Sequence, residues 1–456
     1  MLKKLASYSK TIFAIALPIT LQSLVEYVFI LTDMAFIGQY DPSGGLSAVN
    51  NVLQPFFVLF SFFMAITQGV TIIVSQSIGA KRHLTTRRFV ETALFFNVVI
   101  SLIYLLFWRS SGALVLSLVG AKGVVLALGT AYVTNLSLQF LTTGFGMTAN
   151  AVFQGVGNTR PIMVVAISKC IINIFLDWVM IFGKLGFPEL GIAGAALATA
   201  LSAILGDLAL FILLFRFKVL AIRRRAVLRP VPALFGKVLK LGIPVGLEYI
   251  LWTIGQVLMI GMINSYDQES SGLFGMFNTL IMLSMSLYNG IGVAGMVLVG
   301  QATGAKNPRE ALLAANYSIA FSQAASALTM VLIALFPRQI IMLFGHSQAT
   351  AVHLAPYLVF FGTTMFTKAL NIIAGNSIRG TGNTVWMLYT QIGGTILIVA
   401  TCWILLVTTE MRLMALLLAV FVDEGIRSGI NAVKFYHSQY RAIRQRDREL
   451  EIREAY

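Results

Sequence analysis

Twelve long apolar runs recur along the chain, and they restrict its fold more than any other feature of the sequence. Each has about 20 residues or more, the length that a helix needs to cross the hydrocarbon core of a bilayer. They are continuous rather than alternating, which argues against a transmembrane β-barrel. The sequence therefore predicts an all-α polytopic membrane protein. Its twelve transmembrane helices are expected at approximately 11–38, 48–78, 89–108, 124–150, 161–183, 191–215, 238–264, 271–300, 313–336, 352–377, 384–408 and 413–436.

The formal net charge of +15 would suit a nucleic-acid-binding protein, but the distribution of the basic residues indicates otherwise. With twelve spans, both termini lie on one side of the membrane, and that side collects 25 Lys and Arg residues against 5 on the other. The positive-inside rule then places both termini in the cytoplasm, for a multi-pass protein of the cell inner membrane. The basic residues are topology signals with a second use in lipid contact, and no nucleic-acid partner is expected.

Two short motifs occur twice at the same spacing, which indicates an internal repeat. The segment 74–81 (VSQSIGAK) matches 299–306 (VGQATGAK), and 155–159 (GVGNT) matches 380–384 (GTGNT), both at an offset of 225 residues. Each half holds six spans, an even number, so the copies share one orientation in the membrane. The sequence predicts two six-helix lobes related by a parallel pseudo-two-fold repeat, with alternating access between them.

The longest basic segment, which contains Pro230 and Pro232, separates the two halves. The predicted domains are an N-lobe over 1–215 with the ion-coupling site, a basic cytoplasmic linker over 216–237, a C-lobe over 238–440 and a charged cytoplasmic tail over 441–456. The Gly-rich repeated turns lack the Lys-Ser/Thr of a phosphate-binding loop, so they are interpreted as tight turns between helices.

Five polar residues of the first half fall in one layer in the outer part of the membrane. At about 1.5 Å per helical residue, Asp33 and Asp177 lie roughly 10 to 12 Å below the outer surface. Tyr132 and Thr199 lie roughly 15 Å below it, and Asn173 is one turn from Asp177 on the same helical face. A charged side chain at such a depth is costly and is usually functional. The five residues are predicted to bind a coupling proton or a hard cation such as Na⁺, with no other metal site. For Tyr132, Asn173 and Thr199 taken alone, hydrogen bonding between helices is an equally open interpretation.

The second half does not repeat the acid pair. At the 225-residue offset, Cys402 stands in place of Asp177. Asp33 faces Met259 at an offset of 226, or Gln256 if the Ile-Gly pairs of the two halves are aligned. Ion coupling is therefore predicted for the first half alone.

Other charged residues within the spans are interpreted as structural ion pairs. Lys169 and Asp207 lie on neighbouring spans at a similar depth, roughly 13 Å from the cytoplasmic face, so a pair between them is expected. Asp423 and Arg427 have the i, i+4 spacing of a pair on one helix.

A further set of residues is proposed for the cavity or for contact with substrate: Glu26, Phe29, Ile30, Ile37 and Glu248. Glu26 lies two turns from Asp33 on the same face, and Glu248 lies near the cytoplasmic end of its span. Each of these two acids either lines the cavity or has a packing role, and the sequence leaves both readings open.

The chain resembles the multidrug and toxic compound extrusion (MATE) family, and its DinF branch in particular. The resemblance covers nearly the whole chain and is carried by Pro18 and Asp33-x4-Gly38, the Gln-x-x-Gly-Ala-Lys turns, Gly-x-Gly-Asn-Thr, Asn173-x3-Asp177, and residues 191–199. It implies export of organic, mostly cationic or amphipathic drugs and dyes in exchange for inward flow of H⁺ or Na⁺, by a monomer without other cofactors. It also implies that Asp33, Tyr132, Asn173, Asp177 and Thr199 match the family's first-lobe ion site, and that span 1 bends near Pro18 on protonation.

In one respect the sequence departs from a branch of this family. That branch has an acid eight residues after the proline of span 7, where this chain has Trp252, and Glu248 comes four residues after Pro244 instead. Coupling through an acid of the second lobe is therefore not expected. The DinF resemblance favours H⁺ as the coupling ion.

Three alternatives follow from the same residues. The first is Na⁺-coupled drug antiport, because the same oxygens serve both ions. The second is a flippase for a lipid-linked precursor with a related fold, which would be expected to hold several Lys or Arg residues for a pyrophosphate; only Lys169, Lys368 and Arg427 lie within spans. The third is a membrane-embedded enzyme, which is disfavoured because the chain has no metal-binding His motif and no nucleophile motif.

Overall fold

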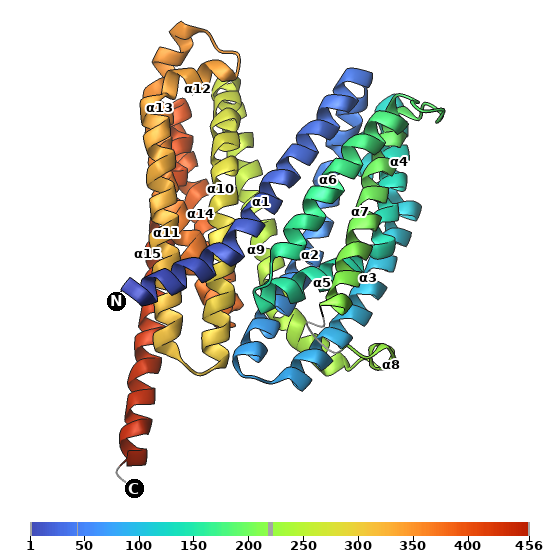
Figure 1. Cartoon of the computed structure of the whole chain (residues 1–456). Coiled ribbons are helices and arrows are strands. Elements are labelled where there is room, and N and C mark those ends of the chain that lie inside the picture. The colour runs from blue at the N-terminus through green and yellow to red at the C-terminus, as the bar shows by residue number, and fades with distance from the viewer. Residues whose placement is uncertain (1, 43, 218–221, 455–456) are drawn as a thin grey trace. The chain divides into compact units, whose positions relative to one another are not determined.

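A computed structural model describes residues 2–42, 44–217 and 222–454, and every element within them is helical (Figure 1). Small parts of the predicted linker (218–221) and tail (455–456) lie outside the described residues. The first half contains α1 (Leu2–Tyr40), α2 (Gly44–Gly79), α3 (His83–Leu118), α4 (Gly123–Leu136), a 3₁₀ turn (Ser137–Gln139), α5 (Phe140–Val156), α6 (Arg160–Ile181), α7 (Gly191–Arg216) and α8 (Arg224–Val227). The second half contains α9 (Pro232–Asn264), α10 (Gln268–Gly304), α11 (Pro308–Leu335), α12 (Pro337–Leu343), α13 (Gln348–Gly380), α14 (Thr384–Thr408) and α15 (Arg412–Glu454).

Within the described residues, eleven helical segments are long and apolar enough to cross a membrane. They correspond to the first eleven predicted spans, with α4, the 3₁₀ turn and α5 together forming the fourth. The twelfth predicted span is the first part of α15, where Asp423, Glu424 and Arg427 interrupt the apolar run. The prediction of an all-α membrane protein with twelve transmembrane helices in two lobes is confirmed by the fold.

The chain forms two compact units whose limits differ from the predicted division. One unit contains residues 21–78 and 82–243, and the other contains 1–20, 79–81 and 244–456. The chain therefore passes from one unit to the other inside two continuous helices: within α1 two residues after Pro18, and within α9 at Pro244. We call these the first-half unit and the second-half unit, after the part of the sequence that makes up most of each.

The N-terminal part of α1 packs closely within the second-half unit, and the N-terminal part of α9 packs closely within the first-half unit. In the second-half unit, the Tyr8 ring stacks on Tyr317 of α11 with centroids 5.2 Å apart. A Cβ atom on Gly290 of α10 would lie 2.7 Å from the Ala16 carbonyl oxygen, closer than real Cβ contacts. In the first-half unit, a Cβ atom on Gly69 of α2 would lie 2.5 Å from the Val238 carbonyl oxygen of α9. Glycine at these contacts allows the helix backbones to approach each other.

The repeated motifs adopt the same backbone conformation in the two halves. Lys81 and Lys306, which are 225 residues apart, have φ angles of 56° and 54°. Gly157 and Gly382, at the same offset, both have φ of 88°. Non-glycine residues with positive φ are uncommon, so their recurrence at matched positions supports the duplication inferred from the sequence.

Asp267, between α9 and α10, caps α10 and gives a prediction on the effect of pH. Its carboxylate accepts hydrogen bonds from the Ser270 hydroxyl and from the Glu269 backbone N–H, and these bonds, that of Ser270 foremost, hold the pKa of Asp267 below its usual value. Such a group stabilises the fold above its unfolded-state pKa of about 3.9, and the contribution is lost as the pH falls through the lower folded-state pKa.

Asp267→Ala is therefore expected to cost about 0.5–2 kcal/mol at pH 7, the usual range for an N-cap, and less as the pH falls below about 4. Thermal unfolding of the detergent-solubilised protein between pH 3 and pH 7 measures this. Asp267→Asn, which keeps a capping oxygen without a titrating charge, is the control. A cost for Asp267→Ala that does not change with pH would contradict the assignment.

Candidate functional site

Asp33, Asp177 and Thr199 come together in the first-half unit from three helices, α1, α6 and α7. The carboxyl groups of Asp33 and Asp177 are neighbours, so that one, when protonated, would donate a hydrogen bond to the other. The Thr199 hydroxyl donates to Oδ2 of Asp33 at 3.1 Å. Asp33 is 8% exposed and Asp177 is fully buried. The structure therefore brings together the residues that the depth estimates placed in one layer.

Asn173 and Tyr132 complete the five predicted positions. Asn173 is fully buried on α6, one turn before Asp177 and beside both carboxyl groups. Tyr132 of α4 is buried within the electrostatic influence of Asp33 and Asp177. The coupling role of the five residues remains a prediction, taken up below.

Several polar atoms at this site have no partner within the described part of the chain. They are Oδ1 of Asp33, both carboxyl oxygens of Asp177 and both amide atoms of Asn173, all buried. Buried polar atoms are nearly always hydrogen-bonded, and a proton shared between the two carboxyl groups would satisfy part of this set. Carboxylate and amide oxygens are suited to a proton or a hard cation. The described residues contain no group of three or more His, Cys, Asp or Glu side chains able to hold a metal ion.

The close packing of α6 against α7 explains the run of small residues before Thr199. A Cβ atom on Gly194 of α7 would lie 2.6 Å from the Met180 carbonyl oxygen of α6, a distance that real Cβ atoms do not adopt. Glycine at 194 therefore sets the separation between the helix of Asp177 and the helix of Thr199.

Gly194→Ala is accordingly expected to destabilise the protein by about 1–3 kcal/mol, the usual cost of overpacking. Gly206→Ala is a matched control on the same helix pair, because its Cβ atom would meet Val165 at an ordinary 3.5 Å. Thermal unfolding in detergent compares the two variants. Equal unfolding temperatures would show that the close approach at Gly194 does not determine this packing.

The ion pair expected between Lys169 and Asp207 is not formed, although both residues lie in the first-half unit. Lys169 Nζ lies over the ring of Phe29 on α1, 5.2 Å from its centroid, and Asp207 accepts a hydrogen bond from Thr142 of α5 at 3.3 Å. The expectation was wrong because equal depth does not fix the direction in which each side chain points around its helix. Lys169 remains within the electrostatic influence of Glu26, Asp33 and Asp207.

The residues proposed for a cavity wall differ in their surroundings. Ile37 is 1% exposed and belongs to an apolar core of the first-half unit, so it is a core residue rather than a cavity residue. Ile30 is 40% exposed, Phe29 lies under the Lys169 ammonium, and Glu26 accepts a hydrogen bond from Gln22 at 3.0 Å. Glu26 and Ile30 are exposed and Phe29 is half-buried, so three of the four first-half candidates are accessible on one stretch of α1.

Glu248 has a partner that the sequence did not indicate. It forms an ion pair with Arg379 of α13, with an N···O distance of 2.6 Å, inside the second-half unit. Arg379 lies in the last turn of α13, two residues beyond the predicted span 352–377. The pair links α9, four residues after Pro244, to α13.

The ion pair expected between Asp423 and Arg427 is present, at 2.5 Å, and it belongs to a larger group. Lys368 of α13 and Glu424 of α15 also join this group, with Lys368 Nζ 3.3 Å from Glu424 Oε1. The sequence does not indicate that Lys368 and Glu424 form a pair, because the two residues are far apart in the chain.

The second-half unit has apolar residues where the repeat would place the acid site. Ile398 and Cys402 stand at the positions of Asn173 and Asp177, and Met259 is one of the two alternative counterparts of Asp33; all three belong to one apolar core. The counterparts of Asp177 and Asn173 are thus apolar, as the sequence offset predicts.

Comparison with known proteins places the chain among membrane transporters. The MatE family model matches residues 18–179 and 244–404, well over half of the chain. The chain is 28% identical over 386 residues to the probable multidrug resistance protein NorM of Thermotoga maritima, covering 82% of this chain and 81% of that protein. It is 26% identical to the multidrug resistance protein PmpM of Pseudomonas aeruginosa, over 81% and 78% of the two chains.

Solved structures share the fold over almost the entire chain. A crystal structure of MATE in the bent conformation has a TM-score of 0.88 at 20% identity, covering 96% of this chain and 97% of that one. An outward-facing multidrug resistance MATE transporter of the MOP superfamily gives the same TM-score, identity and coverage.

Proposed function

The chain belongs to the MatE family of transporters, and on that premise we propose that it is a multidrug efflux antiporter with both termini in the cytoplasm. The multidrug resistance proteins to which it is similar match it over about four fifths of their length, which supports the same activity here. The proposed cargo is organic, mostly cationic or amphipathic compounds, as the motifs typical of the DinF branch imply. The protein is a multi-pass membrane protein and not an enzyme.

The single observation that carries the coupling mechanism is the contact between two buried carboxyl groups. Asp33 and Asp177 repel each other when both are charged, so a proton or cation held between them is strongly favoured. Tyr132, Asn173 and Thr199 supply polar atoms around the pair. We propose that loss of the bound ion creates negative charge that attracts a cationic cargo, and that rebinding of the ion releases it.

The proposed coupling ion is H⁺, as the DinF resemblance implies, with Na⁺ as the alternative. The contact between the carboxyl groups supports H⁺, because one proton is enough to join them through a hydrogen bond. Na⁺ would draw on the unpartnered oxygens of Asp33, Asp177 and Asn173.

Efflux is better supported than transport of a lipid-linked pyrophosphate. Two of the three basic residues within spans, Lys368 and Arg427, are paired with acids of α15. Lys169 is then the one such residue without an ion-pair partner in the described residues. A pyrophosphate would require several basic groups free to pair with it.

Transport by the purified protein in proteoliposomes tests this function. A pH gradient and a Na⁺ gradient are imposed separately, and movement of ethidium is followed by fluorescence. The proposal expects transport driven by the pH gradient. Transport driven by Na⁺ alone would establish the alternative ion, and transport driven by neither would overturn the antiporter assignment.

A further inference from the structure

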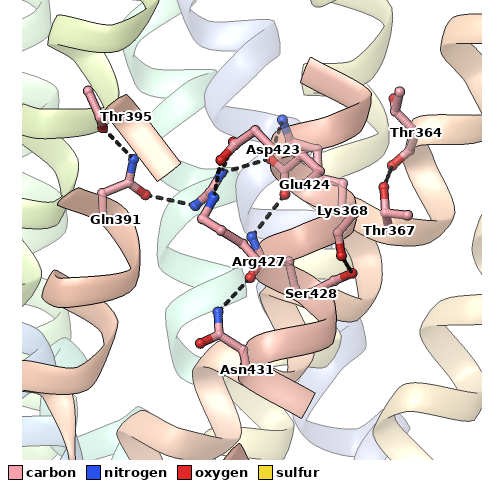
Figure 2. Close-up of polar contacts among 12 residues, drawn as sticks. Thr364, Thr367, Lys368, Gln391, Thr395, Asp423, Glu424, Arg427, Ser428 and Asn431 are labelled. Atoms are coloured by element: carbon pink, nitrogen blue, oxygen red, sulfur yellow. Dashed lines mark hydrogen bonds and ion pairs between the residues drawn. The ribbon is translucent and has the colours of Figure 1, made fainter. Parts of the chain in front are cut away.

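Lys169 of α6 is an intramembrane cation that the proposed coupling mechanism does not use. In the second-half unit, the two other basic residues within predicted spans, Lys368 and Arg427, are paired with acids of α15 (Figure 2). Lys169 lies in the first-half unit, and no carboxylate of the described residues is within ion-pair distance of it. An intramembrane charge is costly and is usually functional. Lys169 is therefore a candidate for a role in transport.

The ammonium group of Lys169 lies over an aromatic ring that can be reached from the surface of the first-half unit. Its Nζ is 5.2 Å from the centroid of the Phe29 ring on α1, within the range of a cation–π interaction. Both residues are half-buried, and Glu26 and Ile30, which lie near Phe29 on α1, are exposed. The same ring face would attract the positive charge of an organic cation.

This ring lies close to the acid pair that is proposed to attract the cargo. Phe29 comes four residues before Asp33, one turn away on the same face of α1. Lys169 comes four residues before Asn173, one turn away on α6. Asp33 is within the electrostatic influence of Lys169. Lys169 therefore holds its own charge where a cationic cargo would interact with both the ring and the acids.

The stem of Lys169 packs against α7 directly beside Asp207. A Cβ atom on Gly206 of α7 would lie 3.6 Å from both Cβ and Cδ of Lys169, an ordinary contact distance. Asp207 is the next residue, and its carboxylate is within the electrostatic influence of Lys169. A lysine stem is flexible, so the ammonium group can turn from Phe29 toward Asp207 while the first part of the side chain stays in place.

Asp207 is able to receive this ammonium group. Its Oδ2 accepts a hydrogen bond from the Thr142 hydroxyl of α5 at 3.3 Å, and a carboxylate can accept several such bonds. A Cβ atom on Gly146 of α5 would clash with Oδ1 of Asp207, so glycine at this position makes room for the carboxylate. Asp207 thus provides a second position for the charge of Lys169.

We propose that Lys169 is a tethered cation that occupies the Phe29 ring in the empty protein and moves to Asp207 when a cationic cargo takes its place. The inference rests on the proposed efflux function and adds a specificity-determining residue to it. The exchange limits how tightly a cation is held, which favours its release. A neutral compound does not compete with Lys169 for the charge of the nearby acids.

Two compounds with the same three phenyl rings test this exchange. Methyltriphenylphosphonium is a cation, and triphenylphosphine oxide is neutral. Titration calorimetry with the purified full-length protein gives the ratio of the Kd of the cation to the Kd of the neutral compound. Lys169→Gln is expected to lower this ratio by about tenfold, the effect of one strong cation–π contact. Lys169→Arg, which keeps the charge, should leave the ratio unchanged.

A second pair of variants shows where the exchange takes place. In Phe29→Leu, which lacks the ring, Lys169→Gln should have a much smaller effect on the ratio. Asp207→Asn should raise the ratio in the presence of Lys169, because the displaced ammonium group loses its second partner. The same substitution should have no effect in Lys169→Gln.

Three results would overturn the inference. They are a ratio that Lys169→Gln does not change, an effect of Lys169→Gln that is equal with and without the Phe29 ring, and an effect of Asp207→Asn that does not depend on Lys169. The second result would show that Lys169 acts only through its general charge. If Lys169→Gln does not accumulate, Lys169→Met provides the same test with an apolar stem of similar length.

Transport in proteoliposomes separates this inference from the proposed function. If a pH gradient drives transport of methyltriphenylphosphonium but the ratio does not depend on Lys169, the exchange fails and antiport stands. If no ion gradient drives transport but the ratio falls in Lys169→Gln, antiport fails and the exchange stands.

Discussion

Asp33→Asn is expected to reduce dye efflux to the background of vesicles without protein, while the protein remains folded in the membrane. The substitution keeps the shape of the side chain and its hydrogen bond with Thr199, but it removes the charge that pairs with a proton beside Asp177. Without that charge, proton uptake can no longer be exchanged for cargo. Efflux of ethidium from cells, and its pH-driven transport in proteoliposomes, measure the effect.

Asp207→Asn is the matched control for this prediction. Asp207 is an acid of the same unit, but its hydrogen bond is to Thr142 rather than to the acid pair. It should retain far more transport than Asp33→Asn. Full drug resistance in cells that express Asp33→Asn would remove Asp33 from the mechanism.

Arg427→Leu is expected to destabilise the protein by about 3–5 kcal/mol, because it leaves a buried carboxylate without its partner. Asp423 is 3% exposed, and both of its oxygens accept hydrogen bonds from Arg427. The two free cysteines, Cys170 and Cys402, are buried, so a thiol-reactive dye reports unfolding as the temperature rises. The double variant Asp423→Asn/Arg427→Leu should recover part of the loss, because no charge is then stranded.

Asp447→Asn offers the comparison with an exposed pair. Asp447 pairs with Arg309 at 2.9 Å, but their side chains are 40% and 67% exposed, so its loss should cost no more than about 1 kcal/mol. Similar losses in Arg427→Leu and Asp447→Asn would show that burial does not govern the strength of these pairs. A double variant no more stable than Arg427→Leu would show that the stranded Asp423 charge is not the cause.

The sequence was sufficient to predict the fold because the thickness of the bilayer sets the length and apolar composition of each helix that crosses it. Apolar runs of the required length located the membrane-spanning helices, and two repeated turns revealed the duplication, later matched by the φ angles at Gly157 and Gly382. The short helices α8 and α12 were missed because each lies outside the apolar runs. The division between the units was also placed differently, because the basic linker is prominent in the sequence whereas the units change inside continuous helices.

The candidate site could be predicted only where the depth of two side chains in the membrane is enough to bring them into contact. Similar depths correctly predicted that Asp33, Asp177 and Thr199 lie together, because their side chains also point toward one another. It failed for Lys169 and Asp207, whose side chains point toward Phe29 and Thr142. Rotation about the helix axis depends on the packing of neighbouring helices, which one sequence does not reveal.

The cluster around Lys368 was beyond sequence reasoning for a related reason. Its contacts join α13 to α15 over more than 50 residues, and no local spacing indicates which acid a distant lysine meets. The i, i+4 pair of Asp423 and Arg427 was found because both partners lie on one helix.

Because α1 and α9 each pass from one unit to the other, the two halves of the sequence are not expected to fold as separate fragments. Each unit borrows a helix segment from the opposite half: 1–20 completes the second-half unit, and the first part of α9 completes the first-half unit. Neither half of the sequence therefore contains all the residues of one compact unit. Two fragments separated in the linker should accumulate stably when they are co-expressed and be degraded when either is made alone, so the ancestral single copy would have needed a second chain to be whole.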